Sequence, residues 1–224
     1  MSSAAVLIVA KAPVPGLAKT RLAGEFGDVG AATLAAAALL DTVRTARGVA
    51  GASVIVALTG RLADAVRSAD LIEALSGCTL ITQRGDGFAQ RLVNAHLDAA
   101  DTGAQRVIQI GMDTPQVRAD QLRSALRRLE PRARRCVLGI ADDGGWWAFG
   151  TALGRGARAL STVTMSRPDT GIATQAALRH AGLTVALLDP MTDVDLPTDI
   201  ADVVRECPDT SEFARTAELL GAVR

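Results

Sequence analysis

The chain has 224 residues, 49% of them apolar, and its 24 lysines and arginines balance 24 aspartates and glutamates. The apolar content supports a sizeable core and excludes an intrinsically disordered chain. A net charge of zero without a basic stripe argues against a nucleic-acid-binding protein.

Three cysteines lie far apart without metal-ligand spacing, which indicates reduced thiols. The amino terminus lacks the basic region of a signal peptide, and Lys11 interrupts its first apolar run. Another apolar stretch, AATLAAAALL, runs into Asp41 and Arg44 and falls short of a membrane span. We therefore expect a soluble, cytoplasmic protein with neither a membrane nor a nucleic acid as partner. The sequence leaves the oligomeric state open.

Short apolar runs alternate with helical patterns along the chain. Most runs are continuously apolar, as is typical of strands buried on both faces of a parallel sheet. The predicted strands are 4–10, 52–58, 78–82, 106–111, 136–141 and 183–188. The segments 61–75 and 88–100 each keep one apolar face at helical spacing. WWAFG at 146–150 follows a strand after only a short turn, so we predict an additional strand there and leave its antiparallel orientation open.

This alternation predicts one domain over 1–224, with a three-layer α/β/α, Rossmann-like fold and a mixed, mostly parallel sheet. No internal repeat or linker divides the chain. In such sheets ligands bind beyond the carboxyl ends of the strands. The polar segments that follow strands are 10–22, 83–87, 112–116, 142–145 and 189–199.

The loop AKAPVPGLAKTRL at 10–22 ends in Lys19-Thr20, like a P-loop, but lacks the glycines of G-x-x-x-x-G-K-[ST]. Pro13 stands where the first glycine belongs, and proline has no N–H to offer a phosphate. The segment is therefore not a P-loop, and the dinucleotide fingerprint G-x-G-x-x-G is missing as well.

The same loop could instead bind an anion through its side chains. Lys11, Lys19 and Arg21 can converge on one phosphate, because no acidic residue separates them. Pro13 stiffens the loop and Gly16 allows a sharp turn. We favour an anion site over the alternative, a surface loop with solvated cations.

Five segments together resemble a known family. They are the loop K-x-P-x-x-G-x-x-K-T-R-L, QRGDGFAQRL (83–92), IGMDTP (110–115), ADDGGWWAFG (141–150) and DVDLPTDI (193–200). In this order they resemble an uncharacterised bacterial transferase family, associated with radical-SAM or selenodomain proteins, of the nucleotide-diphospho-sugar transferase (GT-A-like) superfamily. That family is similar to 2-phospholactate and molybdenum-cofactor guanylyltransferases.

Aspartates follow two of the predicted strands. Asp113 stands at the expected sheet edge, and Asp193, Asp195 and Asp199 cluster after the last strand. A hard cation such as Mg²⁺ takes carboxylate oxygens, and the resemblance implies Asp113 and Asp195 as ligands of Mg²⁺ or Mn²⁺. Asp113 could instead cap a helix or form a turn. We interpret Asp193 as a turn former and Asp199 as a first-turn helix acid.

The resemblance also implies binding roles for two further segments. Gln83, Gly85 and Asp86 match a segment that helps hold the nucleotide in the related guanylyltransferases, although a hairpin-like turn is the alternative. The segment from Asp142 and Asp143 to Gly144 and Gly145 would face the sugar or acceptor. A tight turn with solvated acids is the alternative there.

Other residues carry weaker signals. Trp146 and Trp147 are neighbours in a predicted strand and should face opposite ways. His96 shares the apolar face of its helix, which favours packing over catalysis, and no histidine has a Ser or Cys partner at suggestive spacing. Ser166 or Arg167 is a candidate contact to an acceptor.

Two enzymatic functions and one non-enzymatic function follow. The first is an Mg²⁺-dependent nucleotidyltransferase that moves a nucleoside monophosphate from a nucleoside triphosphate to a small phosphorylated or hydroxyl acceptor. Lys19, Arg21 and Asp113 would act in catalysis, and Lys11 would anchor the nucleotide. The second is a glycosyltransferase with a nucleotide-diphospho-sugar donor. A nucleotide-binding regulator without turnover is the third.

Overall fold

The computed structural model describes residues 3–223 and holds one seven-stranded sheet. The strands are β1 (Ala4–Lys11), β2 (Ala52–Thr59), β3 (Thr79–Thr82), β4 (Arg106–Ile110), β5 (Arg135–Ala141), β6 (Trp146–Ala152) and β7 (Thr184–Met191). Their order across the sheet is β3-β2-β1-β4-β6-β5-β7. All six predicted strands and the additional strand are therefore confirmed.

β6 is the one strand of this sheet that runs against its neighbours. It pairs antiparallel with β4 and with β5, while the pairs β1–β2, β1–β4, β2–β3 and β5–β7 are parallel. The sheet is thus mixed and mostly parallel, as predicted. The parallel strands end at one edge, where the loops that carry the predicted site residues begin.

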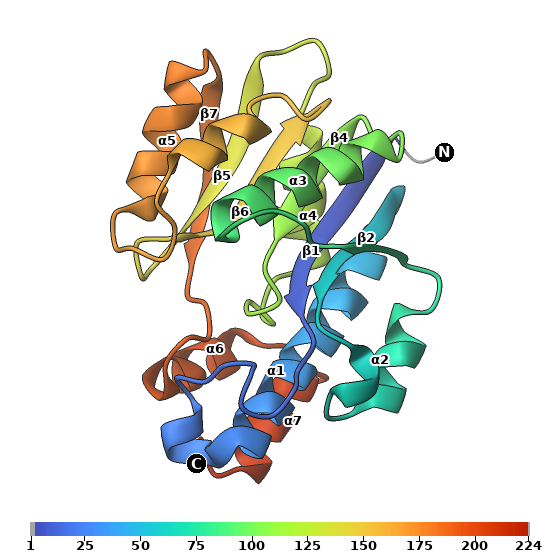
Figure 1. Cartoon of the computed structure of the whole chain (residues 1–224), viewed down its shortest axis with the longest axis vertical. Helices are drawn as coiled ribbons and strands as arrows, with labels where there is room; N and C mark the ends of the chain where they lie inside the picture. The colour runs from blue at the N-terminus through green and yellow to red at the C-terminus, as the bar shows by residue number, and fades with distance from the viewer. Residues whose placement is uncertain (1–2, 224) are drawn as a thin grey trace.

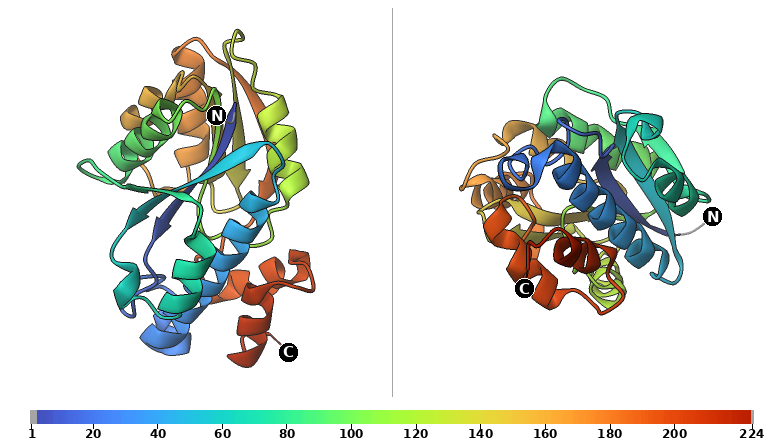
Figure 2. Two further views of the ribbon diagram at one scale, coloured as in Figure 1. Left: turned by 90° about the vertical axis from the view of Figure 1, so that its right-hand side faces the viewer. Right: turned by 90° about the horizontal axis from the view of Figure 1, so that it is seen from below.

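Helices cover both faces of the sheet (Figures 1 and 2). They are α1 (Ala23–Arg47), α2 (Ser68–Leu75), α3 (Phe88–Asp101), α4 (Ala119–Arg127), α5 (Thr170–His180), α6 (Ile200–Glu206) and α7 (Glu212–Leu219). Short 3₁₀ helices occupy Leu62–Asp64, Ala157–Thr162 and Pro197–Asp199. The α1 and α4 side chains pack with Val6 and Ile8 on one face, and α3 packs with Ala5 and Leu7 on the other. Three layers result, as predicted.

The helix predicted over 61–75 is wrong in part. The segment breaks at Arg67, whose φ of 53° lies in the left-handed region, so that a 3₁₀ turn precedes α2. Arg67 is held there by Asp70 at 2.8 Å and by Glu212 of α7 at 3.0 Å. Glu212 is distant in sequence, so local periodicity could not reveal the break.

Helix α1 is long and apolar enough to cross a membrane, longer than the apolar stretch alone had indicated. However, 72% of its most apolar window is buried inside the protein. Its small side chains, from Ala31 to Ala38, pack beneath β1 and beneath the carboxyl-terminal helices. This helix is therefore a core helix of the described fold.

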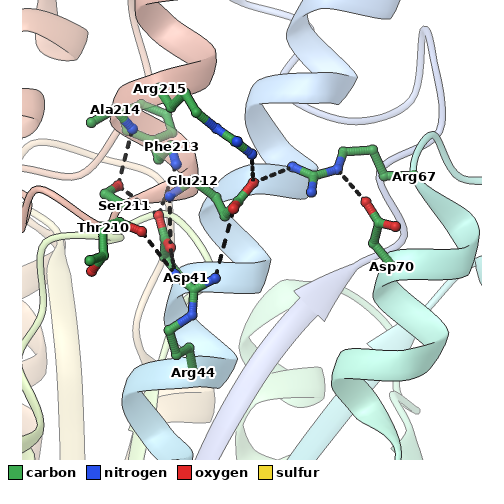
Figure 3. Close-up of polar contacts among 10 residues, drawn as sticks. All are labelled: Asp41, Arg44, Arg67, Asp70, Thr210, Ser211, Glu212, Phe213, Ala214 and Arg215. Carbon is green, nitrogen blue, oxygen red and sulfur yellow. Dashed lines mark hydrogen bonds and ion pairs between the residues drawn. The ribbon is translucent and has the colours of Figure 1, made fainter.

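The carboxyl-terminal helices dock on α1 through one buried carboxylate (Figure 3). Asp41 of α1 accepts hydrogen bonds from Ser211 Oγ at 2.7 Å and from the backbone N–H groups of Glu212 at 3.0 Å and Phe213 at 2.8 Å. Arg44 donates to the same carboxylate at 2.9 Å. Asp41 thus caps the first turn of α7, whose free N–H groups favour an acidic partner.

This docking positions two of the loops at the sheet edge. Fully buried Phe213 of α7 belongs to an apolar cluster with Leu22, which follows the loop after β1, and Val194, which follows β7. Figure 1 shows α6 and α7 gathered with the start of α1 at this end of the molecule. Helix α7 therefore packs against the residues that follow both strands and holds the two loops in place.

Candidate functional site

A cavity of about 930 Å³ opens at the carboxyl edge of the sheet. The predicted site residues that line it are Lys11, Lys19, Arg21, Gln83, Asp113, Asp143, Gly145 and Asp195. The predicted residues that lie outside its lining are Pro13, Gly16, Gly85, Asp86, Asp142 and Gly144. Segments far apart in the sequence therefore meet in one cavity.

Lys19 joins two carboxylates at the centre of this site. Its Nζ lies 3.1 Å from Asp113 Oδ2 and 3.0 Å from Asp195 Oδ1, and only 13% of its side chain is exposed. Burial alone would lower the pKa of Lys19, but the two carboxylates outweigh burial and raise it above the ordinary lysine value. The ammonium of Lys19 therefore stays protonated at neutral pH.

The backbone of Lys19 is unusual. Its φ of 48° is in the left-handed region, which costs free energy for any residue other than glycine. Gly16, three residues earlier, also has a positive φ, 74°, which confirms the sharp turn predicted there. The loop thus curls back so that Lys19 faces the carboxylates.

Arg21 and Lys11 add positive charge to the same cavity. Arg21 Nη1 lies 2.7 Å from Asp195 Oδ2 and remains 63% exposed, so its guanidinium can also reach a bound anion. Lys11 is exposed at the end of β1, and its backbone N–H donates to Met112 Sδ at 3.3 Å. All three predicted cations therefore line the cavity.

Asp113 owes its position to its neighbours. A Cβ on Gly111 would lie 2.3 Å from Asp113 Oδ1, so only glycine lets the carboxylate fold back over the chain. The backbone carbonyl of Asp113 accepts from the N–H of Val194 at 2.9 Å, which ties the loop after β4 to the loop after β7.

Asp195 is held by a turn. The Asp199 carboxylate accepts from the backbone N–H of Asp195 at 2.9 Å and of Leu196 at 2.6 Å. Asp199 is thus an acid in the first turn of the 3₁₀ helix Pro197–Asp199, directly before α6, which agrees with its interpretation as a first-turn helix acid. Its role is to orient the loop that carries Asp195.

Asp193 is the residue whose position the sequence interpretation missed. One oxygen each of Asp113, Asp193 and Asp195 lie within 4.8 Å of one another, a group that could hold a metal ion. Burial, together with the negative charges of Asp113 and Asp143, raises the pKa of Asp193 to about 7. The spacing D-x-D was the available signal, because residues i and i+2 of an extended segment share a side. Val194 between them is buried on the other side.

The segment after β3 contributes one cavity residue. Gln83 Nε2 donates to the carbonyls of Ala10 at 2.8 Å and Ala57 at 2.9 Å, which joins the ends of β1 and β2. Gly85 has a φ of 122°, and the N–H of Asp86 donates to Gln90 Oε1 at 2.8 Å. Gly85 and Asp86 thus form an exposed turn that leads into α3.

The paired glycines after β5 let the chain approach itself. A Cβ on Gly144 would lie 1.9 Å from the carbonyl oxygen of Pro168, so the loop before α5 fills the space above it. Asp143 accepts from the N–H of Gly145 at 2.7 Å and lines the cavity. Asp142 accepts from Thr192 Oγ1 at 2.5 Å.

The two tryptophans of β6 face opposite sides of the sheet, as predicted. Trp147 is 5% exposed, packs against the α1 side and donates from Nε1 to the carbonyl of Asp189 at 3.1 Å. Trp146 packs with Phe149 on the α3 side and is partly exposed at the cavity.

Solved structures share this fold. A protein of Desulfovibrio desulfuricans G20, assigned provisionally as a nucleotide-diphospho-sugar transferase, is 24% identical over 98% of this chain and 97% of its own, with a TM-score of 0.82. A Methanothermobacter nucleotidyl transferase is 14% identical over 95% and 99%, with a TM-score of 0.59. A Mycobacterium tuberculosis H37Rv protein in complex with manganese is 21% identical over 89% and 96%, with a TM-score of 0.52.

These likenesses confirm the Rossmann-like fold of nucleotide-diphospho-sugar transferases that the sequence motifs imply. No match to a curated protein sequence was significant. One family model matches residues 42–167, more than half of the chain. The chain therefore belongs to the family described as uncharacterized proteins conserved in bacteria (DUF2064).

Proposed function

We propose that this protein is a nucleotidyltransferase that uses a divalent cation. It moves a nucleoside monophosphate from a nucleoside triphosphate to a small phosphorylated or hydroxyl acceptor. The observation that carries the proposal is one cavity lined by Lys11, Lys19 and Arg21 and by three grouped carboxylates, with Lys19 and Arg21 paired to Asp113 and Asp195. A triphosphate needs this combination, because its own charge must be neutralised while a metal orients it.

The residues suggest a division of labour. Lys11 and Arg21, which face the cavity from exposed positions, are suited to the β- and γ-phosphates. Lys19 is suited to the negative charge that develops on the leaving pyrophosphate, because it is buried and fully charged. An acceptor phosphate oxygen bonds to the α-phosphorus while the bond to the bridging oxygen breaks, and that electron pair leaves with pyrophosphate. A hydroxyl acceptor also loses its proton to water.

The carboxylates fit a hard divalent cation. Asp113 and Asp195, with Asp193, supply oxygen ligands only, the donor set that Mg²⁺ and Mn²⁺ accept. Burial and, after it, the charges of Asp113 and Asp143 raise the pKa of Asp193, and a bound cation would favour its charged form. When bound, the metal would polarise and orient the phosphates. Lys19, paired with two of these carboxylates, would turn toward the phosphates.

A glycosyltransferase that uses a nucleotide-diphospho-sugar is the second candidate. It is supported by the likeness to the Desulfovibrio protein, with a TM-score of 0.82. Asp113 would then hold the metal against the diphosphate, and Asp143 would contact the sugar. Fold likeness alone does not choose between these two chemistries.

The deciding experiment identifies the leaving group. Purified protein with Mg²⁺ or Mn²⁺ is incubated with each nucleoside triphosphate and with pools of phosphorylated acids and alcohols. GTP is tested first, because the motifs resemble guanylyltransferases. Acceptor-dependent pyrophosphate release supports the proposal, whereas nucleoside diphosphate release from a sugar-nucleotide panel would replace it with the second candidate.

Matched variants control the assay. Asp113→Asn should lower the rate roughly 10²–10³-fold, because it removes a ligand charge at the reacting centre. Asp101→Asn makes the same substitution at an exposed aspartate at the end of α3. This control should leave the rate unchanged. Equal activity in both variants would contradict the role of Asp113.

A further inference from the structure

The cavity extends beyond the carboxylates to an end with different chemistry. We call this the arginine end and define it by Phe88, Arg91, Leu92, Gln109, Trp146 and Met165, all of which line the cavity. They come from α3, β4, β6 and the loop before α5. Apolar side chains make most of its wall, with two polar groups among them.

Arg91 carries a charge that no other residue neutralises. Within residues 3–223 it makes no ion pair, and its buried Nε has no hydrogen-bond partner. Its guanidinium carbon lies 5.9 Å from the centre of the Phe88 ring, a cation–π contact that helps to hold it in place. A partly buried guanidinium without an acceptor is costly, so a ligand is its natural partner.

Gln109 presents a second unpartnered donor. This residue is fully buried, and its Nε2 has no partner among the described residues. Its Oε1 lies 3.1 Å from His96 Nδ1, while His96 Nε2 lies 2.8 Å from Thr151 Oγ1. Burial lowers the pKa of His96 to about 4, so the ring is neutral and its Nδ1–H donates to Gln109. The amide oxygen of Gln109 is therefore occupied, and its Nε2 can only donate.

None of the acids that line the cavity is paired with Arg91 within residues 3–223. Asp113, Asp193 and Asp195 form one group, and Asp143 is near enough to raise the pKa of Asp193. The arginine end thus combines a cation and an amide donor with apolar walls. A group that accepts hydrogen bonds and carries negative charge is its complement.

We propose that the arginine end binds a carboxylate or phosphate group of the acceptor. Arg91 is its counter-ion and Gln109 its second donor, and the carbon body of the acceptor packs on Leu92 and Trp146. The acceptor is therefore a small anionic molecule whose charged group is distinct from the oxygen that reacts. That this anion belongs to the acceptor rests on the proposed function, whereas the binding of an anion at the arginine end does not.

Direct binding tests the proposal without turnover. The probes are glycolate for the carboxylate, inorganic phosphate for the phosphate, and ethylene glycol as an uncharged control. Calorimetry gives the affinities, and fluorescence in a Trp147→Phe background reports events at Trp146, because both tryptophans of the chain line the cavity. One of the two anions should bind, and ethylene glycol should not.

Variants locate the bound anion. Arg91→Gln should weaken binding roughly tenfold to a hundredfold, as expected for loss of a charged hydrogen-bond partner, and Arg91→Lys should restore part of it. Gln109→Met should weaken it about tenfold. Arg123→Gln is the matched control, because Arg123 is exposed on α4 over the other face of the sheet. Melting temperatures show whether each variant is folded.

Several outcomes would overturn the proposal. Binding that changes less than twofold in Arg91→Gln but is lost in Lys11→Gln would mean that anions bind only beside Lys11, Lys19 and Arg21. A loss of nucleotide affinity in Arg91→Gln equal to the loss of anion affinity would assign Arg91 to the nucleotide.

Failure of the proposed function gives a different pattern. Arg91-dependent anion binding without any pyrophosphate release would refute the nucleotidyltransferase but keep the anion site. Pyrophosphate release with an acceptor KM that is unchanged in Arg91→Gln would refute the anion site alone.

Discussion

Two clusters of acids and bases join distant parts of this chain, and they differ in how their charges are satisfied. The Asp41 cluster consists of Asp41, Arg44, Ser211 and Glu212 (Figure 3). Both oxygens of Asp41 accept from fixed donors of α1 and α7. The carboxylate cluster consists of Lys19, Asp113, Asp193 and Asp195, and it has three acids for one buried cation.

The difference is the one expected between a structural cluster and a candidate functional site. A carboxylate that accepts from backbone N–H groups and an arginine stabilises the fold. Acids crowded together destabilise it unless a ligand or metal binds, and such sites are retained for function. Burial and the neighbouring charges of Asp113 and Asp143 together raise the pKa of Asp193 to about 7.

Removal of Asp41 should have the largest effect on stability. Asp41→Ala leaves Ser211 and two backbone N–H groups of α7 without their acceptor, so we expect a loss of about 4 kcal/mol in the free energy of unfolding. Urea denaturation measures it. Asp209→Ala, an exposed aspartate before α7, is the control, with a change below about 0.5 kcal/mol. A loss below about 1 kcal/mol in Asp41→Ala would contradict the stabilising role of the Asp41 cluster.

His96 gives a pH-dependent test of a third buried polar group. Its pKa is about 4 in the folded protein, below the ordinary value of 6.5, because burial disfavours the charged ring. Between these two pH values the unfolded chain therefore binds more protons than the folded chain. The stability that the protein has above pH 6.5, where the ring is neutral in both states, is lost as the pH falls toward 4. At pH 5 wild type should lose about 2 kcal/mol more, relative to pH 7.5, than His96→Gln. Parallel pH profiles would contradict the buried, neutral ring.

Neutralising one acid of the carboxylate cluster should stabilise the protein. Asp193→Asn keeps the shape of the side chain and removes a charge that faces Asp113 and Asp195. In EDTA we expect an increase of about 2 kcal/mol, after allowance for solvent screening at this partly exposed position. Chemical denaturation at pH 8 measures it, with Asp101→Asn as control. A stability loss would mean that Asp193 is a structural acid like Asp41.

The smallest expected effect is at the rim of the Asp41 cluster. Arg215 donates to Glu212 at 2.6 Å but is 64% exposed, so Arg215→Ala should cost about 0.5 kcal/mol. Arg67 contacts the same carboxylate from α2 and is 26% exposed, so Arg67→Ala should cost more. Equal losses in thermal unfolding would show that burial does not set the strength of these pairs.

Much of the fold was predictable because its signals are local. Apolar runs, most of them continuous, identified six strands, and the short turn before WWAFG identified β6. The break at Arg67 was not predictable, because Glu212 of α7 holds it across the sequence. The strength of a periodic pattern does not report such a distant contact.

The candidate site was predictable in part for the same reason. Strand ends placed Lys19, Asp113 and Asp195 at one edge, and the structure brings them within hydrogen-bond distance. Asp193 was interpreted as a turn former because its position beside Asp113 depends on how the loop after β7 crosses the sheet edge. Arg91 gave no signal, since a cation beside a helix's apolar face ordinarily lies in solvent.

The apolar contact of Phe213 with Leu22 and Val194 has a consequence for how the protein is made. Synthesis delivers β1 and the Lys19 loop well before α7, which packs against Leu22 at the end of that loop. The sheet can assemble while the chain is still growing, but its edge takes its final form only when the carboxyl-terminal helices close over α1. A nascent chain that stops after β7 would thus hold the strands of the sheet without the contacts of Phe213 to Leu22 and Val194.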